Sequence, residues 1–575
     1  MKAIILSILV FLVSVDSKCP TDCFCGIRHG RNTVLCENGG MKSIPISEID
    51  KNVEVLIISA PADNPNNLTL GRIFFDFGLL REVQITHSYI PAIGDSSFWP
   101  GYNMRRLDLS FNNLTLLREK DFNGLKNLTS LNLSNNNLAA PPSATFRLLT
   151  NLRNLSLARN KFTSFVPRLF FELHRLEILD LSGNPIKEIN PDNMKDLWPL
   201  RVLNLSYCQL SKLHFHIYQR LPNLEVLDLR YNRFSSLISN EFSFMPFLRN
   251  LYLDHNMLEY LENHTFAGIS LKHLGLSHNR ITEISPCAFC NTTIVKLDLS
   301  HNYLKDLQLL ILMDSGNTLT NLKLSYNPVN AEVVAGILQQ LPNLRELSLS
   351  GIDLSHLTSR MFHNNINLNY LDLSNNKLFN LSSSSIDYLE NLTILDLSSN
   401  KFKALNTSVL SIFDTINQVY LDQNPWSCTD CDFTEMLQWI NASETYKKTC
   451  ETSKRCAKCS SPMQLYEREV STLQLEEMGS CIKPFTQFRV EMLVNPQLGL
   501  IIALSAMMVL LIIIIVIILY RRHGAVYYTH EEERSDEGDK ASLTDANGTL
   551  DDKKLAFITI EDNLDDRSLT KNIIG

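Results

Sequence analysis

The chain has 575 residues, of which 45% are hydrophobic and 20% are charged, and its formal net charge at pH 7 is −8. This weakly acidic balance gives no sign of the basic surface that a nucleic-acid partner requires. The length alone suggests about four domains, but a short repeat runs through most of the chain and indicates one elongated domain instead.

Residues 1–17 have the layout of a secretory signal peptide. Lys2 gives a short basic start, an apolar run follows, and small Ser17 precedes the expected cleavage. A buried strand is the alternative, but such a run at the extreme N-terminus favours secretion. We therefore expect the following residues to lie in an oxidising compartment, where cysteines form disulfides.

Four cysteines, Cys19, Cys23, Cys25 and Cys36, precede the first repeat with the spacing C-x3-C-x-C-x10-C. The end of a repeat array exposes apolar residues that have no neighbouring turn, and a small module must cover them. We therefore predict that residues 18–52 form an N-terminal cysteine cap.

From residue 53 to residue 424 the chain repeats the pattern L-x-x-L-x-L-x-x-N-x-L, mostly in steps of 24 residues. This pattern is the leucine-rich repeat. The alternating leucines point inward from a short strand, and the Asn side chain can bond the backbone of the turn that follows. The prediction is an α/β solenoid, a horseshoe with a parallel sheet on its concave face. The copies open at Leu80, Met104, Leu128, Leu152, Leu176, Leu200, Leu224, Leu248, Leu271, Ile294, Leu319, Leu344, Leu368, Leu392 and Ile416.

A large apolar residue recurs eighteen residues after many of these openings and predicts a second buried spine on the convex side. Its members are Phe122, Phe146, Phe170, Phe242, Phe266, Phe289 and Phe362.

Two copies depart from the pattern in the Asn position. Cys208 is expected to be a free core thiol that replaces the amide, and Ile352 suggests local loosening. Cys287 and Cys290 are expected to pair with each other on the convex side.

The segment 425–482 is expected to cap the other end, because it holds six more cysteines: Cys428, Cys431, Cys450, Cys456, Cys459 and Cys481. Two C-x-x-C pairs in this segment are also compatible with zinc. The oxidising compartment and the two further cysteines favour disulfides over a metal site.

An uncharged apolar run from Leu498 to Leu519 is long enough to cross a bilayer, and Arg521 and Arg522 follow it directly. Basic flanks remain cytoplasmic, so we expect a single-pass plasma-membrane protein with its N-terminus outside. The polar, acidic tail is expected to be disordered. The predicted segments are a signal peptide (1–17), an N-terminal cap (18–52), repeats (53–424), a C-terminal cap (425–482), a linker (483–497), a transmembrane helix (498–520) and a tail (521–575).

Together, the two sets of cysteines, the N-P-W…C…W…C-x-x-P…C order after Asn424, the repeats and the apolar run resemble single-pass leucine-rich repeat receptors. This class includes Toll, Slit-like and neuronal adhesion proteins. The resemblance implies the pairs Cys19–Cys25, Cys23–Cys36, Cys428–Cys459 and Cys431–Cys481, and leaves Cys450–Cys456 as an extra bridge. The tail is too short for a Toll-type signalling domain, which needs over about 100 residues. Tyr527, Tyr528 and Ser535 in the tail are candidate phosphorylation sites.

We expect no catalysis and no cofactor, because the usual hydrolase, zinc-protease and phosphate-binding motifs are absent, and we expect no metal, because disulfides are favoured over zinc at the C-x-x-C pairs. One set of carboxylates recurs at the middle solvent-facing position of the strands, where it is ordinary repeat sequence. This set is Asp108, Asp180, Asp228, Asp298, Asp372 and Asp396.

Many N-glycosylation sequons lie before the apolar run. They are Asn67, Asn113, Asn127, Asn132, Asn154, Asn204, Asn263, Asn291, Asn380, Asn391, Asn406 and Asn441, whereas Asn547 lies in the tail and should stay unmodified. Asn132, Asn154 and Asn204 are expected on the N-terminal part of the concave face. From Leu224 to Asn424 no sequon occupies such a position.

The sequon-free concave region is therefore the predicted ligand-binding surface. It carries a column of rings two residues after the second leucine of each copy, with charged and aromatic neighbours. Tyr and Arg are enriched at binding hot spots, although exposed His and Tyr are also common in repeats without a ligand. The candidate residues are Arg230, Tyr231, Tyr252, Asp254, His255, His273, His278, Lys296, His301, Lys323 and Tyr326.

These observations favour a cell-surface recognition or adhesion receptor that binds an extracellular or cell-surface protein, with homophilic or co-receptor contacts and a cytoplasmic adaptor as further partners. The alternative is an innate-immune pattern receptor or co-receptor that relies on a partner for signalling. If the histidines take part in binding, affinity should change between about pH 5 and 7.

Overall fold

We analysed a computed structural model of the chain, which describes residues 19–429, 431–478, 504 and 507–518. Residues 19–478 contain the predicted caps and repeats. The signal peptide, the linker and the tail lie outside the described residues, as do Cys481, Asn547 and the predicted phosphorylation sites. Of the predicted membrane span, residues 507–518 are helical and exposed. Within the described residues, no helix has both the length and the apolar character needed to cross a bilayer.

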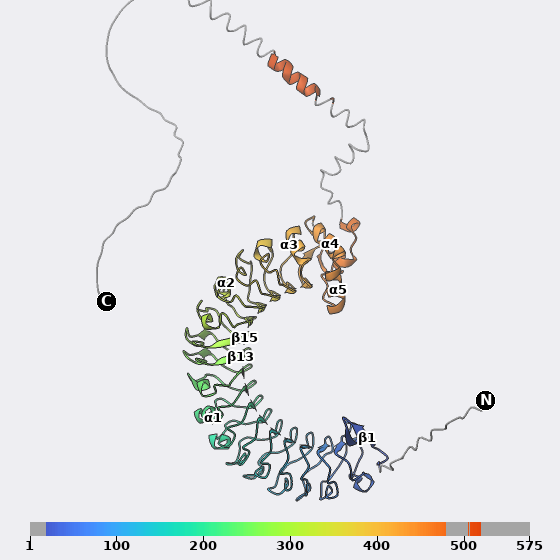
Figure 1. Cartoon of the computed structure of the whole chain (residues 1–575). Helices are drawn as coiled ribbons and strands as arrows, with labels where there is room; N and C mark the ends of the chain where they lie inside the picture. The colour runs from blue at the N-terminus through green and yellow to red at the C-terminus, as the bar shows by residue number, and fades with distance from the viewer. Residues whose placement is uncertain (1–18, 430, 479–503, 505–506, 519–575) are drawn as a thin grey trace, which may run out of the picture. The chain divides into compact units, whose positions relative to one another are not determined.

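The repeats form a curved solenoid with one continuous sheet on its inner side (Figure 1). Strands β1 (Phe24–Arg28) and β2 (Arg31–Cys36) form an antiparallel hairpin, and β2 then pairs in parallel with β3 (Val55–Ile58). The other strands of this sheet are β4 (Glu82–Ile85), β5 (Arg106–Asp108), β6 (Ser130–Asn132), β7 (Asn154–Ser156), β8 (Ile178–Asp180), β9 (Val202–Asn204), β10 (Val226–Asp228), β11 (Asn250–Tyr252), β13 (Ser270–Gly275), β15 (Thr293–Asp298), β16 (Asn321–Lys323), β17 (Glu346–Ser348), β18 (Tyr370–Asp372), β19 (Ile394–Asp396) and β20 (Gln418–Tyr420).

The register of this sheet follows the repeat. From β3 onward, each strand presents its central Leu or Val opposite that of the next strand, so that Leu227 pairs with Leu251 and Leu251 with Leu274. These side chains are fully buried. The alternating pattern therefore places one leucine column inside and leaves the flanking residues on the inner surface, as predicted.

The outer side is built from short helices and turns (Figure 1). The helices are α1 (Phe215–Arg220), α2 (Ala331–Leu338), α3 (Thr407–Phe413), η1 (Ile46–Glu48), η2 (Pro191–Met194), η3 (Glu241–Phe244), η4 (Met313–Ser315) and η5 (Ser383–Ser385), with a small parallel sheet of β12 (Tyr260–Leu261) and β14 (Glu283–Ile284). The predicted phenylalanine spine is buried throughout. Its rings follow one another closely, as in Phe242–Phe266 at 5.7 Å and Phe266–Phe289 at 5.5 Å.

The Asn ladder connects the repeats as the sequence predicts. The side-chain amide of Asn136 donates to Leu109 O at 2.9 Å and to Leu133 O at 3.1 Å. Its oxygen accepts a hydrogen bond from Leu114 N at 3.0 Å. One side chain thus satisfies backbone groups of two turns that would otherwise be buried without partners.

The two exceptional copies behave differently. Cys208 is buried and unpaired, and its thiol lies 3.6 Å from Leu181 O, where an Asn amide would donate. Ile352 is 3% exposed and provides no polar group. The loosening predicted there is absent from the strand pairing, because β17 stays in register with both β16 and β18.

The cysteines at the ends and in the middle of the array form disulfides. The pairs are Cys19–Cys25, Cys23–Cys36, Cys287–Cys290, Cys428–Cys459 and Cys450–Cys456. Cys431 is also disulfide-bonded. The C-terminal cap is made of β21 (Trp426–Ser427), β22 (Cys459–Ser461), α4 (Phe433–Ala442), α5 (Glu444–Ser453), η6 (Met463–Leu465), η7 (Val470–Thr472) and η8 (Leu475–Met478).

Candidate recognition surface on the inner face

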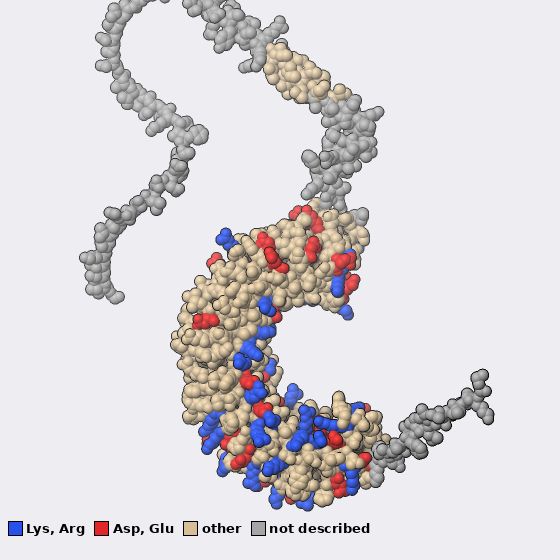
Figure 2. Space-filling model, in the orientation of Figure 1, with Lys and Arg blue, Asp and Glu red and all other residues tan. Residues whose placement is uncertain are grey.

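The eleven predicted ligand-binding residues lie together on five neighbouring repeats. Four of them, Tyr252, His273, Lys296 and Lys323, are on strands β11, β13, β15 and β16. The other seven lie in the turns that leave the strands. Figure 2 shows that charged side chains gather along the inner side of the arc and on the N-terminal repeats.

Six aromatic rings form a continuous column, which we call the ring stack. It consists of Tyr207, Tyr231, His255, His278, His301 and Tyr326. Successive ring centroids lie 4.0, 4.0, 4.1, 4.0 and 4.4 Å apart, with interplanar angles of 9–14°. Tyr207 is the member that the sequence analysis missed. Its position two residues after Leu205 was the available signal.

The backbone sets the spacing of the ring stack. Each of its residues has a positive φ, from 52° to 56°, so every ring leaves its turn in the same direction. The turns are joined by hydrogen bonds, such as Tyr231 N to Asp254 O at 3.0 Å and His278 N to Ser300 O at 2.9 Å. The stack ends at Tyr326, because the equivalent position in the next repeat is Gly351. A Cβ on Gly351 would lie only 2.7 Å from the Tyr326 ring.

A second cluster lies beside the stack and is centred on Tyr252. The guanidinium of Arg230 lies 4.9 Å from the Tyr252 ring centroid and donates to Asp228 Oδ2 at 2.6 Å. This pairing raises the pKa of Arg230. The ring of His273 lies 4.9 Å from that of Tyr252, and burial lowers the pKa of His273. Arg230, Tyr252 and His273 thus form one connected patch that offers a cation, a hydroxyl and an imidazole.

Gly275 leaves room for Asp254 at the centre of this patch. A Cβ on Gly275 would lie 2.2 Å from Asp254 Oδ2. Asp254 Oδ1 accepts hydrogen bonds from Ser277 N at 3.0 Å and from Ser277 Oγ at 2.7 Å. In six other copies an Asp on the strand itself accepts this backbone hydrogen bond. In the copy that contains Gly275, Asp254 of the preceding copy takes over this role.

The two predicted lysines complete the surface. Lys323 Nζ lies 3.4 Å from Asp298 Oδ2, and Lys296 is exposed. Lys323, His301 and Tyr326 also border a hollow of about 790 Å³ that continues along β17 and β18 to Tyr370. Burial raises the pKa of Tyr370 to about 12. The ring stack and the strand face therefore belong to one continuous surface.

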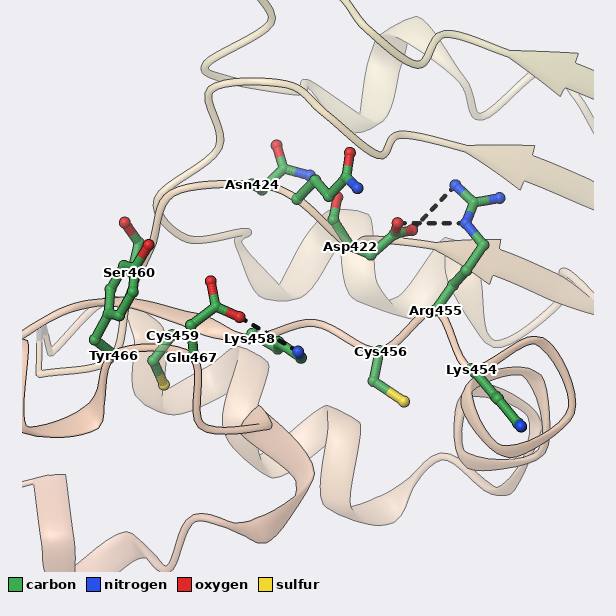
Figure 3. Close-up of a pocket in the computed structure, with 11 residues that line it drawn as sticks. Asp422, Asn424, Lys454, Arg455, Cys456, Lys458, Cys459, Ser460, Tyr466 and Glu467 are labelled. Atoms are coloured by element: carbon green, nitrogen blue, oxygen red, sulfur yellow. Dashed lines mark hydrogen bonds and ion pairs between the residues drawn. The ribbon is translucent and has the colours of Figure 1, made fainter.

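The C-terminal cap reaches this inner face through Arg455. Its guanidinium contacts Asp396 Oδ2 and Asp422 Oδ1, both at 3.0 Å, and lies 4.2 Å from the Tyr420 ring centroid. Arg455 and Asp422 line a pocket of about 420 Å³. Figure 3 shows Arg455 directed at Asp422, with Lys458 and Glu467 paired with each other in the same pocket. These contacts fix the cap against the last two repeats and neutralise the positive charge of Arg455.

The repeated strand carboxylates have a structural role. Each accepts a hydrogen bond from the backbone N–H two residues later, for example Asp298 from Ser300 N at 3.0 Å and Asp372 from Ser374 N at 3.0 Å. The other members, Asp108, Asp180, Asp228 and Asp396, do the same. In the cap, Cys450, Cys456 and Glu469 lie close enough to hold a cation, but the two thiols are joined in a disulfide.

The three predicted concave sequons differ in their environment. Asn154 is exposed on β7. Asn132 and Asn204 are half-buried, and their side-chain oxygens accept hydrogen bonds from Ser134 N and Ser206 N. Of the three, Asn154 is therefore the most open acceptor for a glycan.

Comparisons with known proteins agree with this architecture. The family model described as leucine rich repeat matches residues 79–138, 150–210, 198–258, 248–304 and 342–402. A leucine-rich repeat protein from Leptospira interrogans, LIC12759, has a TM-score of 0.55 and 26% identity, covering 71% of this chain and 94% of that one. The protein chain in the crystal structure of a TLR13–ssRNA13 complex has a TM-score of 0.59 and 23% identity, and the match covers 77% of this chain and 70% of that one.

Among curated proteins, leucine-rich repeat-containing protein 3B of Danio rerio is 28% identical over 132 residues. The match covers 22% of this chain and about half (48%) of that protein. The repeats, the inner parallel sheet and the disulfide-capped N-terminus therefore identify the described part of the chain as a leucine-rich repeat solenoid.

Proposed function

We propose that the chain is a cell-surface recognition or adhesion receptor that binds a protein partner through the inner face of its central repeats. The observation that carries this proposal is the ring stack beside the Arg230–Tyr252–His273 patch. Together they form a pre-ordered aromatic surface on a rigid sheet, which loses little side-chain entropy on binding.

The exposure of the rings supports a contact role. Tyr207, Tyr231 and Tyr326 are 59%, 37% and 44% exposed, although each is held by its stacked neighbours. Aromatic residues that are both fixed and accessible are typical of binding hot spots. Glycans at Asn132, Asn154 and Asn204 would leave the central and C-terminal repeats as the open part of the inner face.

The proposed location is the plasma membrane, with residues 498–520 as the single membrane span. Its support is the charge-free apolar run and the following Arg521 and Arg522. The tail would then bind a cytoplasmic adaptor. Protease digestion of intact cells tests this topology: an antibody to the tail should detect a shortened, protected fragment.

A cell-mixing experiment tests the function. Cells that express the full chain are mixed with cells that do not, and with each other. Adhesion predicts sorting into aggregates, and proximity labelling should identify a surface protein at the contacts. Absence of sorting together with a response to microbial ligands would favour the immune alternative and contradict adhesion.

A further inference from the structure

The Cys287–Cys290 disulfide differs from the cap disulfides in its location. It joins residues three apart in the turn before β15, with a Cα–Cα distance of 4.8 Å. By contrast, Cys23–Cys36 and Cys428–Cys459 close loops with separations of 13 and 31 residues. Because the stabilisation from a disulfide grows with the loop that it closes, this bond contributes least to the fold.

The turn that carries this bond is held in place by other contacts. His264 N donates to Cys287 O at 2.8 Å, and Gly268 N donates to Cys290 O at 3.3 Å. Cys287 N donates to the side chain of Asn263 at 3.0 Å. The turn can therefore keep its position in the solenoid when the disulfide opens.

An imidazole lies beside the bond. His264 Nε2 is 3.4 Å from Cys287 Sγ. His264 is exposed, and both cysteines are half-buried, so a small thiol can approach. A neighbouring imidazolium stabilises a thiolate, and a stabilised thiolate leaves more readily in thiol–disulfide exchange. Cys208 has the opposite surroundings, because burial raises its pKa to about 12.

We propose that Cys287–Cys290 is a thiol–disulfide exchange site for extracellular dithiols. A thiolate of the dithiol attacks Cys290 Sγ, forms a mixed disulfide there and releases Cys287 as a thiolate next to His264. The second thiol of the dithiol then attacks the other sulfur of the same dithiol, which is bonded to Cys290 Sγ in the mixed disulfide. This step releases Cys290. The two cysteines gain two electrons and two protons, and the dithiol leaves as a disulfide.

The test is differential alkylation of the full chain on intact cells. The cells are treated with increasing dithiothreitol, a small dithiol that glycans at Asn263 and Asn291 should not exclude. Newly exposed thiols are then alkylated and located by mass spectrometry. We expect Cys287 and Cys290 to be alkylated at dithiol concentrations that leave Cys23–Cys36, Cys428–Cys459 and Cys450–Cys456 intact. Alkylation only together with the cap cysteines, or after them, would overturn the proposal.

Two controls separate the effect of accessibility from the effect of His264. Cys450–Cys456 also closes a short loop, with a separation of six residues, but Cys450 is buried. Cys450–Cys456 should open at a higher dithiol concentration than Cys287–Cys290. This order would show that accessibility, and not loop length alone, controls the opening. The variant His264→Gln should open Cys287–Cys290 several-fold more slowly than the wild type while the cap disulfides open unchanged. An unchanged opening rate in this variant would contradict the role assigned to His264.

Discussion

Asp254 occupies the space that a side chain on Gly275 would need, with its Oδ2 only 2.2 Å from the position of a Cβ there. Asp254 in turn holds the backbone N–H and the hydroxyl of Ser277. The glycine and the carboxylate are therefore one structural unit, although they belong to different repeats.

We expect Gly275→Ala to displace Asp254 and break its bonds to Ser277. The loss should lower the free energy of unfolding by about 1–3 kcal/mol, the cost of leaving such groups unsatisfied. Thermal unfolding of the secreted ectodomain, residues 18–496, measures the effect. Gly78→Ala is the control, because nothing lies within 4 Å of a Cβ at Gly78. Equal melting temperatures for the two variants would contradict this account.

We expect buried Glu241 to lower the stability of the fold at neutral and alkaline pH. Burial raises its pKa to about 7, above the ordinary 4.5. The folded state therefore binds the proton more tightly, so stability is complete below pH 4.5 and is lost as pH rises through 7. Glu241→Gln should raise the free energy of unfolding by about 1–3 kcal/mol at pH 8. It should have little effect at pH 4.5, and exposed Glu262→Gln should have little effect at either pH. The same gain from Glu241→Gln at both pH values would rule out this explanation.

Cys208 is a weaker hydrogen-bonding group than the Asn that it replaces. Its thiol can donate toward Leu181 O, and its sulfur is a weak acceptor for Ile186 N, which also bonds to Asn184 O. In the next copy, Asn232 Oδ1 accepts a hydrogen bond from the equivalent Leu210 N. We expect Cys208→Asn to restore the ladder and stabilise the ectodomain by about 1 kcal/mol, whereas Cys208→Ala should destabilise it. A lower melting temperature for Cys208→Asn would contradict this expectation.

The ring stack should make the ectodomain sensitive to acid. Burial, and the neighbouring charge of His278, lower the pKa values of His255 and His301. The unfolded state then binds more protons, so stability is complete above about pH 6.5 and falls as pH drops below that value. Asp254 and Asp298 oppose the effect, and Arg230 adds to it at His255. Because His301 is exposed and His255 is only partly buried, the change should stay below about 1 kcal/mol.

Melting temperatures at pH 7.5 and pH 5.5 test this prediction. The triple variant with Gln at His255, His278 and His301 should lose less stability on acidification than the wild type does. A matched variant with Gln at His29, His174 and His356, which lie outside the stack, should retain the wild-type response. A wild-type slope in the stack variant would exclude the imidazoles as its source.

Much of the fold could be predicted from the sequence because the period fixes it. Every leucine, ladder Asn and spine Phe occupies the same position in each turn, so one turn describes the next. The column that became the ring stack was visible for the same reason. The 4.0 Å spacing of its rings could not be predicted, because it depends on positive φ values that the residue types Tyr and His do not indicate.

Two further features could not be predicted, because they join residues from different repeats or modules. Arg455 reaches Asp396 across 59 positions only because the C-terminal cap folds back over the last strands. Asp254 replaces a strand Asp only because the following copy has Gly275. The spacing of Arg455 and Asp396 does not occur in the repeat pattern, and Asp254 and Gly275 depart from the residue types that the pattern contains.

The central claim is that the inner face of the central repeats binds a protein partner. The most direct test compares two triple variants of the full chain on cells, using a partner found by proximity labelling. Alanine at Tyr231, Tyr252 and Tyr326 should abolish binding, while surface expression remains normal. Alanine at Tyr102, Tyr260 and Tyr303, which are exposed tyrosines outside the ring stack, should leave binding unchanged. Full binding by the first variant would contradict the claim and place the partner on another surface.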